Sequence, residues 1–186
     1  MPETILRGGT ALLDAEKILT RLGIAEGMIV ADLGCGGGGH FVAPASRLVG
    51  RTGHVYAVDI QKAVLHTVES KLRLQHVTNV DLVWSDLEKL GAASIPSASC
   101  DLALVANVLF QNKDHAAILS EALRFIKQGT ILAVLDWKKA ASPLGPSLDL
   151  RIDPSVIKEL GIKAGATFVD EFDPGAYHTC LVFRKN

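Results

Sequence analysis

The sequence has few cysteines, few aromatic residues and no excess of charge of either sign. Its three cysteines, Cys35, Cys100 and Cys180, lie far apart in 186 residues and form no C-x-x-C pair. That spacing excludes a disulfide framework and a zinc site built on paired cysteines, so we expect reduced, mostly buried thiols. Nineteen Lys and Arg against twenty Asp and Glu give a net charge of -1. No overall field therefore draws DNA, RNA or an anionic membrane to the chain.

Long apolar runs are also missing. The run at residues 102–110 is well below the roughly 20 residues that a membrane-spanning helix needs. Residues 1–4 open no basic segment followed by an apolar core. We therefore expect a cytoplasmic protein without a membrane span. The histidines share no spacing that would bring them to one metal ion, and no H-E-x-x-H pattern occurs, so the sequence predicts no metal site.

Short apolar runs alternate with helical patterns along the chain. Strands are expected at residues 28–33, 54–59, 80–84, 102–106, 130–135, 166–172 and 177–183. Helices are expected at residues 10–22, 41–49, 62–75, 114–127 and 155–160. Strands that are apolar on both faces and separated by helices predict a doubly wound, Rossmann-like α/β fold with helices on both faces of the sheet.

The end of the chain breaks this alternation. Two strand-like runs are joined only by Asp173-Pro174-Gly175-Ala176. A turn this short makes an antiparallel hairpin, so the last strand must run against its neighbour in the sheet.

The length of 186 residues and the hydrophobic content of 48% fit one domain with a sizeable core. We interpret residues 1–23 as an N-terminal helical cap segment and residues 24–136 as a ligand-binding half. Residues 137–186 then supply a loop on the substrate side and the terminal hairpin.

Five glycines gather between the first strand and the following helix. Gly34, Gly36 and Gly39 satisfy G-x-G-x-x-G, and Asp59 closes the next strand where a ribose-binding carboxylate is expected. Glycine lets the backbone turn tightly and approach a ligand, and the helix start offers free N–H groups. The pattern predicts a nucleotide-like ligand; the alternative is a glycine-rich turn that binds nothing.

Asp32 distinguishes between two kinds of nucleotide-like ligand. It stands two positions before the first glycine. An anion there would oppose a pyrophosphate, but it suits a ligand that carries an ammonium and a sulfonium. A cationic adenosyl cofactor is favoured over a dinucleotide.

These residues carry a family resemblance. V-A-D-L-G-C-G-G-G at residues 30–38 resembles the first motif of class I S-adenosylmethionine-dependent methyltransferases, and V-Y-A-V-D at residues 55–59 resembles their second. S-D-L at residues 85–87 is similar to the third motif, and residues 101–109 are similar to the fourth strand. F-I-K-Q-G-T at residues 125–130 departs by one residue from the usual L-K-P-G-G turn.

The resemblance spans residues 24–183 and implies a seven-stranded sheet of order 3-2-1-4-5-7-6 with strand 7 antiparallel, which agrees with the hairpin deduced above. It also implies S-adenosylmethionine as the cofactor. Within the family, the likeness is to small bacterial methyltransferases similar to those of ubiquinone and menaquinone biosynthesis; D-W-K-K at residues 136–139 and S-P-L-G-P at residues 142–146 contribute to it.

The resemblance assigns roles to the residues that match its motifs. Asp59 would bind the ribose hydroxyls rather than cap the next helix, and Asp86 would meet the adenine amino group rather than form a plain turn. Asp32 would hold the cofactor's amino group or be satisfied by loop N–H groups, and the backbone of Asn107 would flank the methionine part. The full set expected to bind the cofactor is Asp32, Gly34, Cys35, Gly36, Gly38, Asp59, Ile60, Asp86, Leu87 and Asn107.

Methyl transfer from a sulfonium is an in-line displacement, so the protein mainly positions and desolvates the reactants. A general base is needed only if the acceptor must lose a proton. Candidates at the carboxyl ends of the strands are Asp136, Lys138, His115, Tyr177 and His178. Cys35 is interpreted as a packing residue rather than a nucleophile.

The acceptor is expected to be a small molecule, enclosed by residues 138–149 acting as a lid; the same segment also fits a plain connector. The sequence lacks a basic stripe interleaved with aromatic residues, which disfavours nucleic acid. Two alternatives stay open: a non-catalytic methyltransferase fold that binds cofactor or a partner, and an NAD(P)-dependent oxidoreductase. The identity of the acceptor and the oligomeric state, a homo-oligomer included, are left open.

Overall fold

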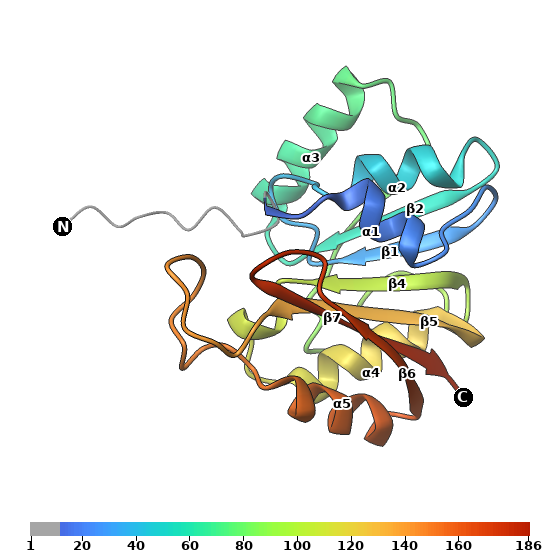
Figure 1. Cartoon of the computed structure of the whole chain (residues 1–186). Coiled ribbons are helices and arrows are strands. Elements are labelled where there is room, and N and C mark those ends of the chain that lie inside the picture. Colours follow the sequence, from blue (N-terminus) through green and yellow to red (C-terminus); the bar gives the residue numbers. More distant parts are fainter. Residues whose placement is uncertain (1–11) are drawn as a thin grey trace.

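The computed structural model describes residues 12–186 (Figure 1). In this part of the chain, seven strands form one sheet in the order β3-β2-β1-β4-β5-β7-β6. The strands are β1 Ile29–Leu33, β2 His54–Asp59, β3 Val80–Trp84, β4 Cys100–Ala106, β5 Ile126–Trp137, β6 Ala166–Phe172 and β7 His178–Lys185. The helices are α1 Ala15–Arg21, α2 Val42–Val49, α3 Lys62–Leu74, α4 His115–Phe125 and α5 Pro154–Lys163, with a 3₁₀ turn, η2, at Leu109–Gln111.

The sheet is parallel from β3 to β5, and its far edge is antiparallel. β1 pairs in parallel with β2 and β4, β2 with β3, and β4 with β5. β7 runs against both β5 and β6, as its arrow in Figure 1 shows. The predicted fold class, strand order and reversed last strand are therefore confirmed.

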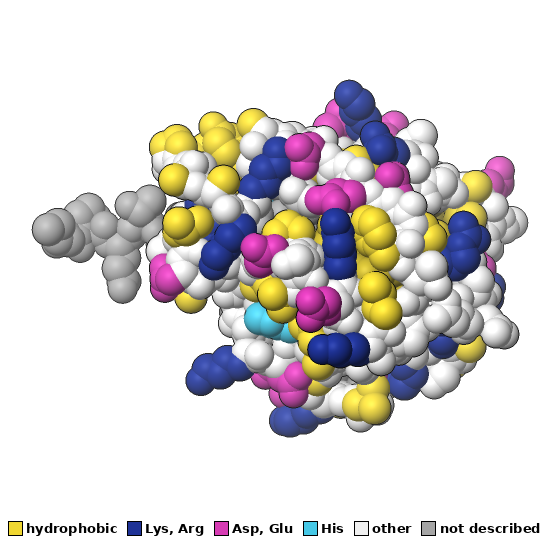
Figure 2. Space-filling model, turned by 60° about the horizontal axis from the view of Figure 1, so that its bottom comes forward, with side chains coloured by type: hydrophobic (Ala, Val, Ile, Leu, Met, Phe, Trp, Pro, Cys, Tyr) yellow, Lys and Arg dark blue, Asp and Glu magenta, His cyan; other side chains and the backbone are white. Residues whose placement is uncertain are grey.

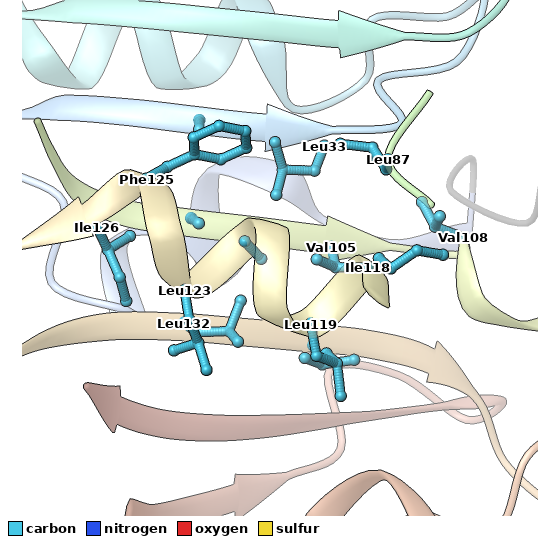
Figure 3. Close-up of a cluster of buried hydrophobic side chains, with 14 of the residues drawn as sticks. Leu33, Leu87, Val105, Val108, Ile118, Leu119, Leu123, Phe125, Ile126 and Leu132 are labelled. Carbon is cyan, nitrogen blue, oxygen red and sulfur yellow. The ribbon is translucent and has the colours of Figure 1, made fainter. Parts of the chain in front are cut away.

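Two helical layers cover the sheet (Figure 1): α1, α2 and α3 lie on one face, and α4 and α5 lie on the other. Each layer buries its own hydrophobic cluster against the sheet. Figure 3 shows the cluster beneath α4, where Ile118, Leu119 and Phe125 of the helix lie over Leu33 and Val105 of the strands. Burial of both faces explains why the central strands are apolar throughout.

The first helix starts later than the sequence predicts. Residues 10 and 11 lie outside the described residues, and α1 begins at Ala15 because Asp14 caps it. The Asp14 carboxylate accepts a hydrogen bond of 3.1 Å from the Lys17 amide, which satisfies one of the free N–H groups at the helix start.

The predicted helix at residues 114–127 ends two residues early, at Phe125. Ile126 instead opens β5, where it pairs with Cys100 of β4. Lys127 extends to Asp101 of the same neighbouring strand, with 2.6 Å between its Nζ and the carboxylate. Pairing with β4 thus overrides a helical pattern that continues in the sequence.

The carboxyl ends of β1 to β5 meet at one edge of the sheet, on the left in Figure 1. The glycine-rich loop, the loops after β2, β3 and β4, and the segment after β5 all leave from this edge, and the β6–β7 turn reaches it from the other direction. Ligands of open α/β sheets bind outside this edge. No helix in residues 12–186 has the length and apolar character to cross a membrane.

Candidate functional site

The glycine-rich loop follows β1 and is fixed to β2. The amides of Gly34 and Cys35 both donate to the Val58 carbonyl, at 2.8 and 2.9 Å. Gly34 has φ +78, and a Cβ there would overlap the Val108 side chain in the loop after β4. Glycine is therefore required at this position both by the turn and by the close approach of Val108.

The next glycines border open space. A Cβ added at Gly36 or Gly37 would meet no protein atom within 4 Å. Gly36 needs its positive φ of +63, but neither a positive φ nor a close neighbour requires glycine at position 37. Lys71 of α3 holds the loop in place, because its Nζ donates to the carbonyls of Gly37 and Gly38 at 3.0 and 3.3 Å. The loop thus offers a bare backbone surface on which a ligand fits.

Asp59 ends β2 with both carboxylate oxygens engaged. Oδ2 accepts a hydrogen bond of 3.0 Å from the Gly36 amide, and Oδ1 accepts one of 2.9 Å from the Gln61 amide. The residue at the N-cap position of α3 is Gln61, so Asp59 does not cap that helix. An ionised carboxylate has acceptor capacity beyond two hydrogen bonds, and Asp59 therefore still has room to accept from a ligand.

Asp32 is the opposite case. The residue is 2% exposed, and within residues 12–186 its Oδ2 has no hydrogen-bond partner. Burial, and then the nearby charge of Asp59, raise the pKa of Asp32 to about 7. A buried carboxyl oxygen without a hydrogen-bond partner destabilises the fold. A cationic ligand group could therefore bind to Asp32 Oδ2 and satisfy it.

Cys35 lies between these two acids in the loop. Burial raises the pKa of its thiol far above the ordinary range, and the charges of Asp32 and Asp59 raise it further. A thiol that does not ionise is no nucleophile. This fits the interpretation of Cys35 as a packing residue.

The loop after β3 carries the predicted adenine contacts. Asp86 accepts a hydrogen bond of 3.1 Å from the Glu88 amide and lies 3.2 Å from Lys89 Nζ, while Leu87 is buried. Ile60 is exposed at the end of β2. Ser85, which the sequence did not single out, is buried with its hydroxyl unpartnered.

Asn107 follows β4 in a left-handed conformation, with φ +56. Its amide donates to Leu135 at 2.8 Å, and its carbonyl accepts from Gln111 Nε2 at 2.7 Å. The residue is 4% exposed, and among the described residues neither the oxygen nor the nitrogen of its side chain has a partner. The free polar groups of Asn107 are thus on its side chain, whereas the sequence pointed to its backbone.

Three of the five catalytic candidates have structural partners. Asp136 accepts from the Trp137 and Leu109 amides at 2.8 and 3.1 Å and so anchors η2; burial still raises its pKa to about 7. Lys138 pairs with Asp173 at 2.7 Å, and His115 Nε2 lies 3.0 Å from the Asn112 carbonyl. These contacts hold loops together at the edge of the sheet.

The remaining candidates begin the last strand. Tyr177 is half-buried, and its carbonyl accepts from the Lys138 amide at 2.9 Å. His178 is 1% exposed and leaves Nε2 unpartnered. Its ring lies against Trp137, which the sequence did not mark as functional; the ring centroids are 4.2 Å apart.

A family model described as "Methyltransferase domain" matches residues 24–156, which is more than half of the chain. The chain belongs to the methyltransferase domain family. The resemblance seen in the sequence motifs is confirmed, and it favours a methyltransferase over the NAD(P)-dependent oxidoreductase alternative.

Two solved structures are similar to this methyltransferase-domain protein. A SAM-dependent methyltransferase from Aquifex aeolicus superimposes with a TM-score of 0.86 at 26% identity, covering 95% of this chain and 92% of that one. A putative type 11 methyltransferase from Sulfolobus solfataricus superimposes with a TM-score of 0.75 at 26% identity, covering 94% of each chain.

Among curated proteins, the ubiquinone/menaquinone biosynthesis C-methyltransferase UbiE of Laribacter hongkongensis is 32% identical over 148 residues. That match covers 78% of this methyltransferase-domain chain and 58% of the relative. The chain thus spans little more than half the length of this relative.

Proposed function

We propose that this protein binds S-adenosylmethionine and transfers its methyl group to a small-molecule acceptor. One observation carries the proposal: the unpartnered, buried Oδ2 of Asp32 lies beside a glycine loop whose Gly36 and Gly37 face open space. An anion beside a bare backbone surface suits a cationic adenosyl ligand, and would repel a pyrophosphate. The motif order and the relative from Aquifex aeolicus, which is SAM-dependent by name, support the same cofactor, and the family match supports methyl transfer.

The residues present fit this cofactor. Asp32 would hold its ammonium, Asp59 its ribose hydroxyls, and the amides at Gly34 to Gly38 would allow its close approach. Asp86 and Leu87 would border the adenine, with Ile60 and Cys35 completing the set, and the Asn107 side chain would meet the methionine end. When bound, S-adenosylmethionine supplies an electrophilic methyl group on a sulfonium.

The protein itself mainly positions the two reactants and excludes water from them, rather than transferring a proton. Asp136, Lys138 and His115 already hold loops, so they fix the edge of the sheet at which the acceptor must lie. Holding two reactants in line and excluding water accounts for a large part of such a rate enhancement. No proton relay is required unless the acceptor itself loses a proton.

A small molecule is the acceptor that the surface favours. On the face shown in Figure 2, Lys and Arg side chains are interspersed with Asp and Glu, without a stretch of one sign. That pattern offers little to a polyanion. The relative from Laribacter hongkongensis is by name a quinone-biosynthesis enzyme, which supports a small acceptor here. A cytoplasmic location stays a prediction from the sequence.

The test is release of S-adenosylhomocysteine from S-adenosylmethionine in the presence of phenols, quinols, thiols and amines, beside pools of transfer RNA and peptides. We expect turnover with a member of the small-molecule panel. Turnover confined to RNA or peptides would refute the small-molecule acceptor. Tight cofactor binding without turnover on any acceptor would favour the alternative of a fold that binds cofactor without catalysis.

A further inference from the structure

Trp137 and His178 form an aromatic pair at the carboxyl edge of the sheet. They are register partners at the end of β5 and the start of β7, with ring planes inclined by 36°. Side chains two positions apart share a face of a strand. The residues two positions from Trp137, His178 and Asp32 all lie in the cluster beneath α1, α2 and α3: Leu135, Cys180 and Val30. The pair therefore lies on the same face as Asp32, with β4 between them.

Both rings carry a buried polar atom without a partner. Trp137 Nε1 and His178 Nε2 are closed off from solvent and make no hydrogen bond in the part of the chain that the structure describes. An indole N–H only donates, so Trp137 requires an oxygen or nitrogen acceptor. Leaving such groups unpaired in the interior is destabilising. Packing alone would be served as well by Phe and Leu, which carry no such cost.

A close-fitting segment lies against the Trp137 ring of the pair. Residues 138–150 contain no helix or strand, yet a Cβ at Gly145 would lie 2.5 Å from the Trp137 ring. Arg151, itself 4% exposed, holds this segment. Its guanidinium donates to five oxygens of the segment: the carbonyls of Lys138, Ala140, Leu144 and Pro146 and the hydroxyl of Ser142. One side chain thus holds an irregular segment against the Trp137 ring.

Two cations lie near the pair, Arg151 and Lys138, and Lys138 is paired with Asp173 at 2.7 Å. Within residues 12–186, the guanidinium of Arg151 has only neutral oxygens as hydrogen-bond partners and no carboxylate at salt-bridge distance. Burial, and then the charges of Arg151 and Lys138, lower the pKa of His178 to about 4. His178 is therefore neutral at physiological pH, and its Nε2 donates to a ligand oxygen only in the tautomer that carries the proton on that nitrogen. A negatively polarised ligand oxygen is the group that this surrounding favours.

We propose that Trp137 and His178 form the polar end of the acceptor pocket and bind a small molecule through a negatively polarised oxygen, beneath a cover of residues 138–150 that Arg151 latches. The acceptor class is thus a phenol, enol or carboxylate rather than an amine. This inference rests on the proposed function, because it assigns the acceptor side of the same site. The two Nε atoms are buried in the closed state, so entry requires the cover to move.

The experiment uses Trp137 as its own reporter. The chain has two tryptophans, and Trp84 is exposed with its Nε1 already bonded to the Ile60 carbonyl at 2.8 Å. In Trp84→Phe, all tryptophan fluorescence comes from Trp137. The protein is saturated with S-adenosylhomocysteine and titrated with phenol, benzoate and 4-hydroxybenzoate, and with benzylamine as a cation of similar size. We expect a saturable change with an oxygen-bearing probe and none with benzylamine.

A matched pair of variants then isolates the N–H group. Trp137→Phe keeps an aromatic ring but removes the N–H donor. The affinity for the probe that gave the fluorescence change should therefore fall about tenfold, as measured by calorimetry. Trp84→Phe, which removes an N–H that already has a protein partner, should leave the affinity for that probe unchanged. Affinity for S-adenosylhomocysteine should stay within about twofold in Trp137→Phe, which also shows that the variant is folded.

The outcomes separate the two proposals. Failure of wild-type protein to bind S-adenosylhomocysteine would refute the proposed function, and this inference with it. If S-adenosylhomocysteine binds but no oxygen-bearing probe alters Trp137 fluorescence, or benzylamine acts equally, the pocket assignment is wrong while the proposed function stands. Equal losses of probe affinity in Trp137→Phe and Trp84→Phe would also overturn the assignment.

Discussion

Asp32, the residue before the last of β1, and Asp59, the last residue of β2, lie on neighbouring parallel strands, and the charge of Asp59 adds to burial in raising the pKa of Asp32 to about 7. Both oxygens of Asp59 have a backbone amide as partner in the protein, whereas Oδ2 of Asp32 has no partner within residues 12–186. This difference between two adjacent carboxylates gives the first prediction.

Asp32→Asn should stabilise the unliganded protein at alkaline pH. A carboxyl whose pKa is raised on folding binds more protons folded than unfolded, so its contribution to stability falls as pH rises from about 4 to about 7. Removing the charge should raise the free energy of unfolding by about 1–3 kcal/mol at pH 8 and much less at pH 4. Urea unfolding at both pH values checks this, with the exposed Asp81→Asn as control.

The same acid predicts how cofactor binding depends on pH. A ligand ammonium favours the carboxylate form, so affinity for S-adenosylmethionine should rise from pH 6 to pH 8, and binding near pH 7 should release a proton. Calorimetry in two buffers of different ionisation enthalpy measures that proton. Asp32→Asn should bind more weakly and without proton release; an unchanged affinity in this variant would remove Asp32 from the site.

Two glycines of the loop should respond differently to the same substitution. Gly34→Ala combines a positive φ with overlap on Val108, so it should lower the free energy of unfolding by about 2 kcal/mol or more. Gly37→Ala meets no protein atom and should leave stability within about 0.5 kcal/mol while weakening cofactor binding. Thermal unfolding measures the stability of the two variants, and calorimetry measures their affinity for the cofactor. If Gly37→Ala bound the cofactor as wild type does, no ligand would lie against that part of the loop.

Asp59→Ala should affect stability and affinity together. The variant leaves the Gly36 and Gln61 amides without their acceptor, which costs about 1–3 kcal/mol of stability. It also removes the hydrogen bonds expected to the ribose, so the folded variant should bind S-adenosylmethionine more weakly by roughly 1.5–3 kcal/mol. Affinity is measured by calorimetry well below the melting temperature. An affinity equal to that of wild type would make Asp59 a purely structural residue.

Arg151→Met should open the cover without affecting the cofactor site. Loss of five hydrogen bonds frees residues 138–150, so limited proteolysis should cut there faster than in wild type. S-adenosylhomocysteine affinity should not change, because the hydrogen bonds of Arg151 within residues 12–186 all go to residues 138–146 and none to the glycine loop. Arg47→Met, which removes only an exposed pair of 3.8 Å with Glu16, serves as control. Equal proteolysis of both variants would show that Arg151 does not latch the cover.

The sequence predicted best those features that depend on local pattern. Strands β2, β3 and β6 have the expected bounds, because each is a short apolar or β-branched run between turn residues. Asp32 and Asp59 were found because each lies at or next to the end of a strand beside the glycine loop. The α4 to β5 boundary was missed because pairing with Cys100, far away in the chain, decides it.

No sequence pattern of this kind marked the cover, residues 138–150, or the Arg151 side chain that holds it. Arg151 binds mostly backbone carbonyls, which every residue carries, so no partner side chain marks it in the sequence. Trp137 meets His178 only because the antiparallel register of β5 and β7 brings them opposite each other. Register is a property of the assembled sheet, and the sequence pattern at residues 138–149 fitted a lid and a connector alike.

The most direct test of the central claim is a calorimetric titration of the wild-type protein with S-adenosylmethionine, S-adenosylhomocysteine and NADH. We expect one binding site for each adenosyl ligand, with a micromolar dissociation constant and thus a binding free energy of about −8 kcal/mol. We expect no heat with NADH. Heat with NADH and none with either adenosyl ligand would contradict it, since a dinucleotide would then occupy the loop beside Asp32.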